Sequence, residues 1–117
     1  MENSRKITEK ERVLLSYLIN KASLSLPYDW DETLRVLPLD DGSMGSLYLI
    51  PNFHTKNKEE RSFGQQISEC NFKDIDGIDV IASLNLDDIG DLFELDIWKV
   101  NFQPLIEIAS EFHDVAT

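Results

Sequence analysis

The sequence predicts an α+β fold in which one N-terminal helix packs on a mostly antiparallel sheet of about five strands, followed by a short C-terminal helix over residues 105–112. Three observations support this prediction: a capped amphipathic segment near the start, an Asp-Gly hairpin signal in the second half, and a strongly alternating segment at residues 91–105. At 117 residues, we expect residues 1–117 to form a single domain.

The helix is expected over residues 7–22. Thr8 and Glu11 have the spacing of a capping box, in which each side chain accepts a hydrogen bond from the other residue's backbone N–H. An apolar stripe follows at helical spacing, formed by Val13, Leu14, Tyr17, Leu18 and the stem of Lys21. A stripe of this kind needs an apolar surface to cover, and the predicted sheet provides it.

The first half of the chain also predicts two short strands. Residues 23–31 read as a connector in which Trp30 packs its indole ring on the core. Residues 34–39 and 47–50 are short β-compatible runs joined by a glycine-containing turn, so we expect them to pair. Residues 51–66 are polar and have neither the helical nor the strand period, which predicts a surface loop with at most one helical turn.

The second half predicts a three-stranded meander. Residues 67–75 and 78–86 flank Asp76 and Gly77, and the Asp-Gly pair favours a type I′ hairpin turn. A further turn leads to the last strand, which should end before Pro104 because proline has no backbone donor.

The last strand provides the candidate binding site. If Phe93, Leu95 and Ile97 face the core, strand alternation places Leu92, Glu94, Asp96 and Trp98 on the opposite face. Two carboxylates and a tryptophan then share one surface. Three further carboxylates, from Asp87, Asp88 and Asp91, are expected at its rim.

Acidic charge is concentrated in the second half. Residues 1–63 contain nine Lys/Arg and ten Asp/Glu, whereas residues 64–117 contain two and twelve, for a net charge of −11. Such a field disfavours nucleic acid and anionic membranes and would steer a basic protein partner, although solubility alone is another explanation. There is neither an apolar run of about twenty residues nor a signal peptide, so we expect a soluble cytoplasmic protein.

Catalytic and metal-binding motifs are not found in the sequence. Neither His54 nor His113 lies near a nucleophile motif, and the aspartates around Gly77 do not fit an EF-hand loop. Cys70 is the single cysteine, so it cannot form an internal disulfide, and its strand position favours a buried, unreactive thiol. We therefore expect no cofactor, no metal ligands and no catalytic residues.

Two other functions stay open. Glu94 and Asp96 should have Cα atoms about 6–7 Å apart, a separation that also suits the acid–base pair of a carboxylate- or metal-dependent hydrolase. A homodimer formed through an edge strand would need no ligand. Trp98 either covers the face on which it lies or provides an aromatic anchor for a partner.

Three blocks of sequence carry a family resemblance. They are R-K-I-T-E-K-E-R-V-L-L-S-Y-L near the start, D-D-G-S-M-G-S-L in the middle, and residues 74–105, where the segment G-D-L-F-E-L-D-I-W-K is the most specific. The blocks resemble a bacterial family of small acidic proteins known only as a domain of unknown function. The family pattern usually has an acid where this chain has Asn101.

The resemblance implies a single α+β domain of bacterial origin, and it supplies no catalytic residue. Small acidic cytoplasmic proteins are often immunity proteins that neutralise toxins, and this is an analogy alone. On that analogy, we expect a non-enzymatic protein-binding module that neutralises a basic partner through its acidic sheet face.

Overall fold

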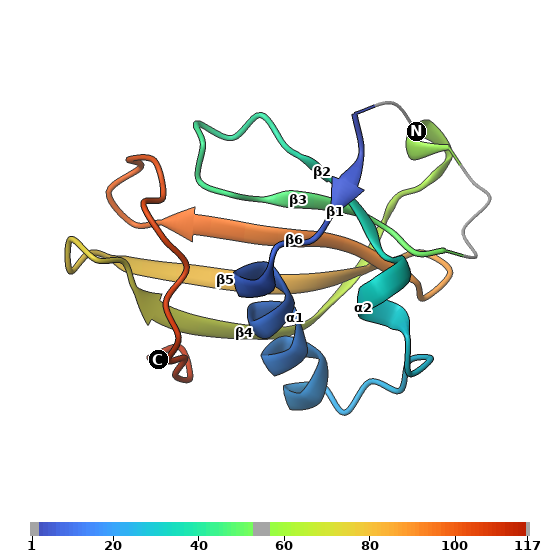
Figure 1. Cartoon of the computed structure of the whole chain (residues 1–117), viewed down its shortest axis with the longest axis horizontal. Helices are drawn as coiled ribbons and strands as arrows, with labels where there is room; N and C mark the ends of the chain where they lie inside the picture. The colour runs from blue at the N-terminus through green and yellow to red at the C-terminus, as the bar shows by residue number, and fades with distance from the viewer. Residues whose placement is uncertain (1–2, 53–56, 117) are drawn as a thin grey trace.

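The computed structural model describes residues 3–52 and 57–116, so His54 lies outside the described residues. Six strands form one antiparallel sheet, and α1 and α2 lie on one of its faces (Figure 1). In sheet order the strands are β1 (Arg5–Lys6), β2 (Arg35–Pro38), β3 (Leu47–Ile50), β6 (Leu92–Lys99), β5 (Asp79–Asp87) and β4 (Phe63–Lys73). The helical elements are α1 (Glu9–Lys21), α2 (Trp30–Thr33) and the 3₁₀ turn η1 (Lys58–Glu60).

The predicted antiparallel sheet with an N-terminal helix is confirmed. The sheet has six strands instead of about five, because the two-residue β1 pairs with β2 before the chain enters α1. Strand β6 lies between β3 and β5, so it joins the first half of the chain to the second. Within the described residues, no helix is both long and apolar enough to cross a bilayer.

Helix α1 begins at the predicted capping box. The Glu11 N–H donates to Thr8 Oγ1 at 3.1 Å, and the Thr8 N–H donates to Glu11 Oε1 at 2.9 Å. These bonds satisfy two backbone donors at the start of the helix. The buried stripe is rotated from the predicted one, because Val13 is exposed. The apolar side chains that α1 buries are Leu14, Leu15, Leu18 and Ile19.

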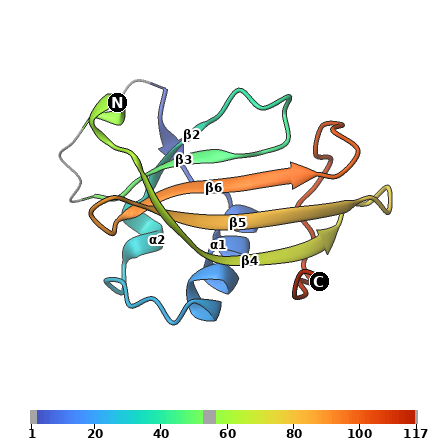
Figure 2. The same ribbon diagram turned by 180° about the vertical axis from the view of Figure 1, so that it is seen from behind.

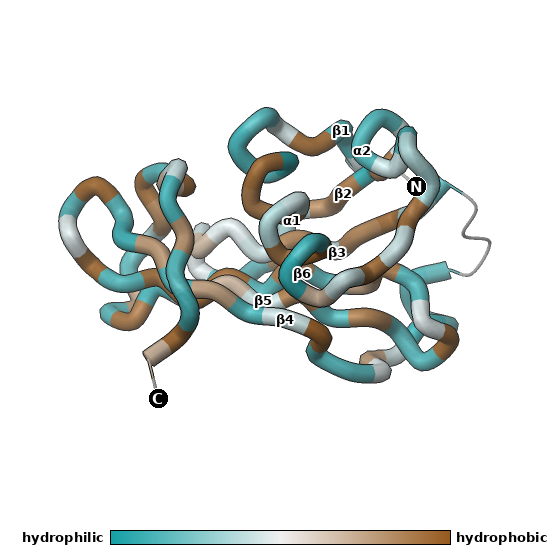
Figure 3. Tube along the Cα trace, turned by 90° about the horizontal axis from the view of Figure 1, so that it is seen from below, coloured by the Kyte–Doolittle hydropathy of each residue, from teal (hydrophilic) through white to brown (hydrophobic). Residues whose placement is uncertain are grey.

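The core lies between α1 and one face of the sheet. Trp30 packs against this core, as the sequence predicts, and Ser68 Oγ donates to the Leu18 carbonyl of α1 at 2.8 Å. The tube is apolar over much of β2 and β3 (Figure 3). The sheet residues that belong to this core are Val36, Leu47, Leu49, Cys70, Phe72, Val80, Ala82, Leu84, Leu86, Leu92, Leu95 and Ile97.

Cys70 is buried in this core on β4, as expected. Burial raises the pKa of its thiol to about 11, so only about one molecule in ten thousand carries the reactive thiolate at neutral pH. We predict that iodoacetamide leaves the native protein unmodified and alkylates it fully in urea, as measured by intact mass. Rapid alkylation of the folded protein would contradict the buried position.

The predicted C-terminal helix at residues 105–112 does not form. This segment returns irregularly across the helix-bearing face of the sheet (Figure 1). The backbone N–H groups of Ile106 and Glu107 donate to the Asp74 carboxylate at 2.8 and 3.0 Å. Further along, the backbone of His113 makes two hydrogen bonds to β4, at 2.7 and 2.8 Å. Bonds to partners outside the segment thus replace those that a helix would make within itself.

The predicted hairpin between β4 and β5 forms, but its turn is not of type I′. A type I′ turn needs positive φ at both central residues, and within this turn only Gly77 has it, at 81°. The loop is longer, because the Asp74 N–H donates to the Ile78 carbonyl at 3.0 Å. Both loop carboxylates bind the ammonium of Lys99, which lies 2.9 Å from Asp74 and 2.7 Å from Asp76. Lys99 is therefore a buried structural cation.

Candidate functional site

Neither α1 nor α2 covers the second face of the sheet (Figure 2). Glu94, Asp96 and Trp98 of β6 lie on this face, because Leu95 and Ile97 between them are buried in the core. The structure thus brings together the two carboxylates and the tryptophan that the sequence predicts on one surface. We call the surface formed by Glu94, Asp96 and Trp98 the acidic face.

Strand alternation breaks at the start of β6. A register shift next to the pair of Leu86 with Leu92 marks a β-bulge. Leu92, predicted on the acidic face, is buried in the core instead. Phe93, predicted in the core, packs edge-on against Tyr48 with ring centroids 6.0 Å apart. Phe93 is the extra residue of the bulge, because Leu92 and Glu94 pair with the consecutive residues Leu86 and Asn85. Leu92 therefore faces the opposite side from the one predicted, and the predicted alternation holds only from Glu94 onward.

The two carboxylates of the acidic face differ in their surroundings. Glu94 is half-buried, and burial raises its pKa, as does the negative charge of Asp96 beside it. Asp96 is exposed, and its Oδ1 lies 3.4 Å from Ser46 Oγ. The raised pKa of Glu94 shows that its ionised form is disfavoured. A cation bound beside the pair would relieve the repulsion between the two charges.

The side chain of Asn85 hydrogen-bonds to the Glu94 carboxylate and also has an acceptor oxygen of its own. It faces Glu94 across the β5–β6 ladder and is 8% exposed. Its Oδ1 is buried and accepts no hydrogen bond from the described residues. An unpaired buried carbonyl of this kind costs about 1–3 kcal/mol. The hydrogen bond with the Asn85 side chain and the positive charges of Lys58 and Arg61 partly offset the rise in the pKa of Glu94, so the centre of the acidic face contains donors as well as acceptors.

Two aromatic rings are exposed at the end of β6. Trp98 is 40% exposed and Phe102 is 68% exposed, and their ring centroids lie 6.0 Å apart. The turn that presents Phe102 is closed by its N–H, which donates to the Lys99 carbonyl at 2.9 Å. Phe102 has a φ of 63°, which is uncommon for a bulky residue. We call Trp98 and Phe102 the aromatic pair; Phe102 lies beyond the alternating strand pattern, so the sequence does not predict its place beside Trp98.

Asp87 is not at the rim of the acidic face, where the sequence analysis placed it. It is 3% exposed, and its Oδ2 lies 2.9 Å from Nη2 of Arg61. Burial opposes ionisation of Asp87, but hydrogen bonds from the Asp91 N–H, Arg61 and the Ile89 N–H outweigh it, so its pKa lies below its ordinary value. Asp87 is thus part of a buried ion pair, and we leave it out of the candidate surface.

Arg61 is the buried cation that the sequence analysis missed, since it lies in the predicted surface loop. Its Nη1 donates to the Leu49 carbonyl and its Nη2 to the Leu92 carbonyl, each at 2.6 Å. Its guanidinium lies over the rings of Tyr48 and Phe93, 5.2 and 5.0 Å from their centroids. Arg61 therefore connects β3 to β6 as well as neutralising a buried carboxylate of β5.

The other two rim residues lie in the turn between β5 and β6. Asp88 is exposed, and its backbone N–H donates to the Ser62 carbonyl at 2.9 Å. Asp91 is half-buried and lines a cavity. This turn lies at the opposite end of β6 from Trp98, so Asp88 and Asp91 are separated from the aromatic pair by the length of the strand.

Comparison with known proteins identifies the family of this chain and gives no individual relative. The curated proteins gave no match, and the solved structures gave none either. One family, described as "Domain of unknown function (DUF6984)", matches residues 4–109. The matched range includes α1, all six strands and the acidic face. Because the match covers most of the chain, the protein belongs to this family of unknown function, as its sequence blocks predict.

Proposed function

We propose that the protein is a non-enzymatic binding module that receives a basic protein on its acidic face and, in the manner of an immunity protein, neutralises it. One observation carries this proposal. Glu94 and Asp96 share with Trp98 a sheet face that neither α1 nor α2 covers, and the exposed ring of Trp98 packs against that of Phe102.

The chemistry of this surface suits lysine and arginine side chains. An exposed carboxylate such as that of Asp96 accepts charge-assisted hydrogen bonds, and exposed aromatic rings attract cations over their faces. Tryptophan is among the residues that contribute most to binding at protein interfaces. The net charge of −11 adds long-range steering of a basic partner.

The open position of Asp96 supports binding over hydrolysis. Enzymes hold paired carboxylates in concave pockets that enclose the substrate, whereas Asp96 is exposed on a sheet face. The raised pKa of Glu94 is the observation that favours a carboxylate-dependent hydrolase instead. A hydrolase would need a further element to enclose the substrate over the acidic face.

Affinity capture from a bacterial lysate tests the proposal. We expect the wild-type protein to retain a basic protein that is lost from a Glu94→Lys/Asp96→Lys variant and released by salt. The matched control, Asp31→Lys/Glu32→Lys, makes the same change of net charge on α2, which lies on the other side of the sheet, and should retain the partner. If all three baits retain the same proteins, the acidic face is not the binding surface.

The aromatic pair gives a second prediction. A Trp98→Ala/Phe102→Ala variant should bind the captured partner at least about tenfold more weakly, because exposed aromatic anchors carry much of the binding energy of an interface. Calorimetric titration of the purified partner measures the change. Tyr28→Ala is the matched control, since Tyr28 is 97% exposed in the connector before α2. Equal affinities for both variants would contradict a role for the aromatic pair.

A further inference from the structure

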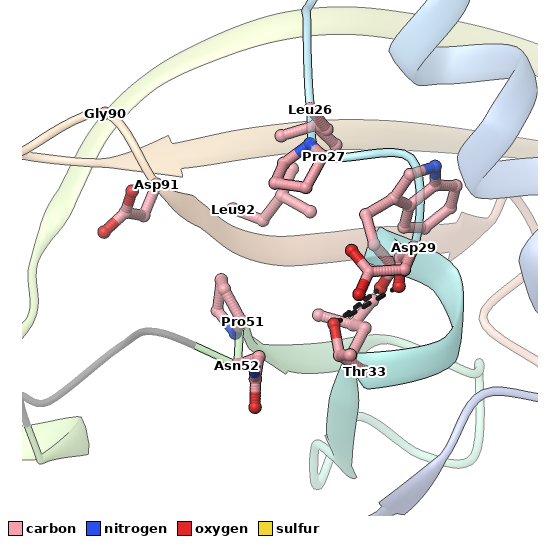
Figure 4. Close-up of a pocket in the computed structure, with 11 residues that line it drawn as sticks. Leu26, Pro27, Asp29, Thr33, Pro51, Asn52, Gly90, Asp91 and Leu92 are labelled. Atoms are coloured by element: carbon pink, nitrogen blue, oxygen red, sulfur yellow. Dashed lines mark hydrogen bonds between the residues drawn. The ribbon is translucent and has the colours of Figure 1, made fainter.

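A cavity of about 90 Å³ lies where three segments meet: the start of α2, the end of β3 and the start of β6 (Figure 4). It is on the helix-bearing side of the sheet and is therefore separate from the acidic face. Most of its lining is apolar. The apolar lining residues are Leu26, Pro27, Trp30, Leu34, Pro51 and Leu92.

One wall of the cavity carries the carboxylate of Asp29. Asp29 is the N-cap residue of α2, a position where an aspartate normally accepts a hydrogen bond from its own helix, yet its side chain makes no such bond. The carboxylate points across the cavity toward Pro51 and Leu92 (Figure 4). The backbone carbonyl of Asp29 accepts hydrogen bonds from Glu32 and Thr33, at 3.0 and 3.2 Å, which hold the residue in place.

The lining residues that the structure describes offer no positive charge to neutralise this carboxylate. Among the described residues that line the cavity, none is lysine, arginine or histidine. A second carboxylate, that of Asp91, lies on the far side of the cavity from Asp29 (Figure 4). Trp30 adds an aromatic surface, and ammonium groups are attracted to the faces of indole rings.

The size of the cavity limits the ligand. One water-sized group needs about 10–15 Å³ of such a cavity, so a cavity of about 90 Å³ holds about six to nine non-hydrogen atoms. An anion would be repelled by Asp29. A wholly apolar molecule would remove water from the carboxylate without replacing its hydrogen bonds, which carries a free-energy cost. A cation on a short apolar body satisfies both the charge and the lining.

We propose that this cavity binds a small organic ammonium ion. The ammonium group pairs with the carboxylate of Asp29, and the apolar body packs against Leu92 and Trp30. The free amine and the side chain of a partner's lysine share this chemistry. The proposal does not depend on the acidic face, which lies on the other side of the sheet.

A fluorescence titration tests this site. The chain has two tryptophans, so a Trp98→Phe background leaves Trp30 as the only indole reporter, inside the cavity lining. The probe is n-pentylammonium, with six non-hydrogen atoms, and 1-pentanol is its neutral analogue of equal length. We expect a saturable change with pentylammonium and binding at least about tenfold weaker with pentanol.

Matched variants separate the site from general attraction of cations to an acidic protein. Asp29→Asn should weaken pentylammonium binding at least about tenfold, and it should keep the fold because the Asp29 side chain makes no capping hydrogen bond that the substitution could remove. Asp31→Asn, on α2 two residues away and outside the cavity lining, should leave pentylammonium binding unchanged. Equal binding by both variants, equal binding of pentanol, or no saturable change with pentylammonium would each overturn the proposal.

Two further titrations distinguish a free amine from a lysine side chain as the ligand and test whether the cavity binds independently of the acidic face. If N-acetyl-lysine methylamide binds as tightly as pentylammonium, the site accepts lysine side chains; if it binds much more weakly, the site is for free amines. Both results support an ammonium site. The Glu94→Lys/Asp96→Lys variant should bind pentylammonium as the parent does, so failure of the acidic-face proposal would leave this one standing.

Discussion

An Arg61→Met variant should lose about 3–5 kcal/mol of unfolding free energy, the usual cost of removing one partner of a buried ion pair. Both side chains of the Arg61–Asp87 pair are fully buried, and Nη2 of Arg61 lies 2.9 Å from Oδ2 of Asp87. Methionine fills a similar volume but leaves Asp87 without this cation. It also removes the donors that bind the Leu49 and Leu92 carbonyls. Urea denaturation followed by circular dichroism measures the loss.

The control for this variant is Arg12→Met, which removes an exposed pair with Glu9 on the surface of α1. Exposed pairs contribute little because water and salt screen them, so this variant should unfold at nearly the same urea concentration as the wild type. Similar destabilisation by both substitutions would show that the buried position of Arg61 does not matter.

An Asp74→Asn variant should be less stable at neutral pH by about 2 kcal/mol, since one pKa unit corresponds to about 1.4 kcal/mol. Burial alone would raise the pKa of Asp74. Hydrogen bonds from the Ile106 N–H, Lys99, and the Ile75 and Glu107 N–H groups outweigh burial and lower the pKa to about 2, from an ordinary value of 3.8. Because the folded state has the lower pKa, this stabilisation is complete above about pH 4 and is lost as the pH falls toward 2.

Denaturation midpoints measured from neutral to acidic pH check this prediction. The difference in denaturation midpoint between the wild type and Asp74→Asn should be largest at neutral pH and should disappear as the pH falls toward 2. Asp114→Asn is the control, because Asp114 pairs with Lys21 at the surface and its side chain is 83% exposed. A constant gap at every pH would mean that the charge of Asp74 does not contribute.

Local patterns predicted the parts of the fold that local physics determines. The capping box of Thr8 and Glu11 and the hairpin at Gly77 depend on residues close in sequence, and both were predictable. Strand alternation also placed Glu94, Asp96 and Trp98 on one face. These are the residues on which the candidate site depends.

The errors arise where distant residues decide the outcome. The bulge that buries Leu92 adds one residue to the strand without a distinctive sequence. Arg61 and Asp87 are ordinary charged residues in a polar sequence, and only the fold brings them together in the interior. The C-terminal segment has the composition of a helix, but the Asp74 carboxylate takes the N–H groups of Ile106 and Glu107. Such pairings are not encoded in the spacing of nearby residues.

The position of β6 between β3 and β5 has a consequence for the order of folding. The β2–β3 hairpin and the β4–β5–β6 meander are each local in sequence, and they pair only where Leu47 and Tyr48 meet Leu95 and Glu94. The paired residues Leu47 and Leu95 are far apart in the sequence, and the entropic cost of bringing them together is incurred before any contact across the junction stabilises it. We therefore expect the joining of these two units to be the slow step of folding. Arg61 bridges the same junction, so its loss should chiefly accelerate unfolding.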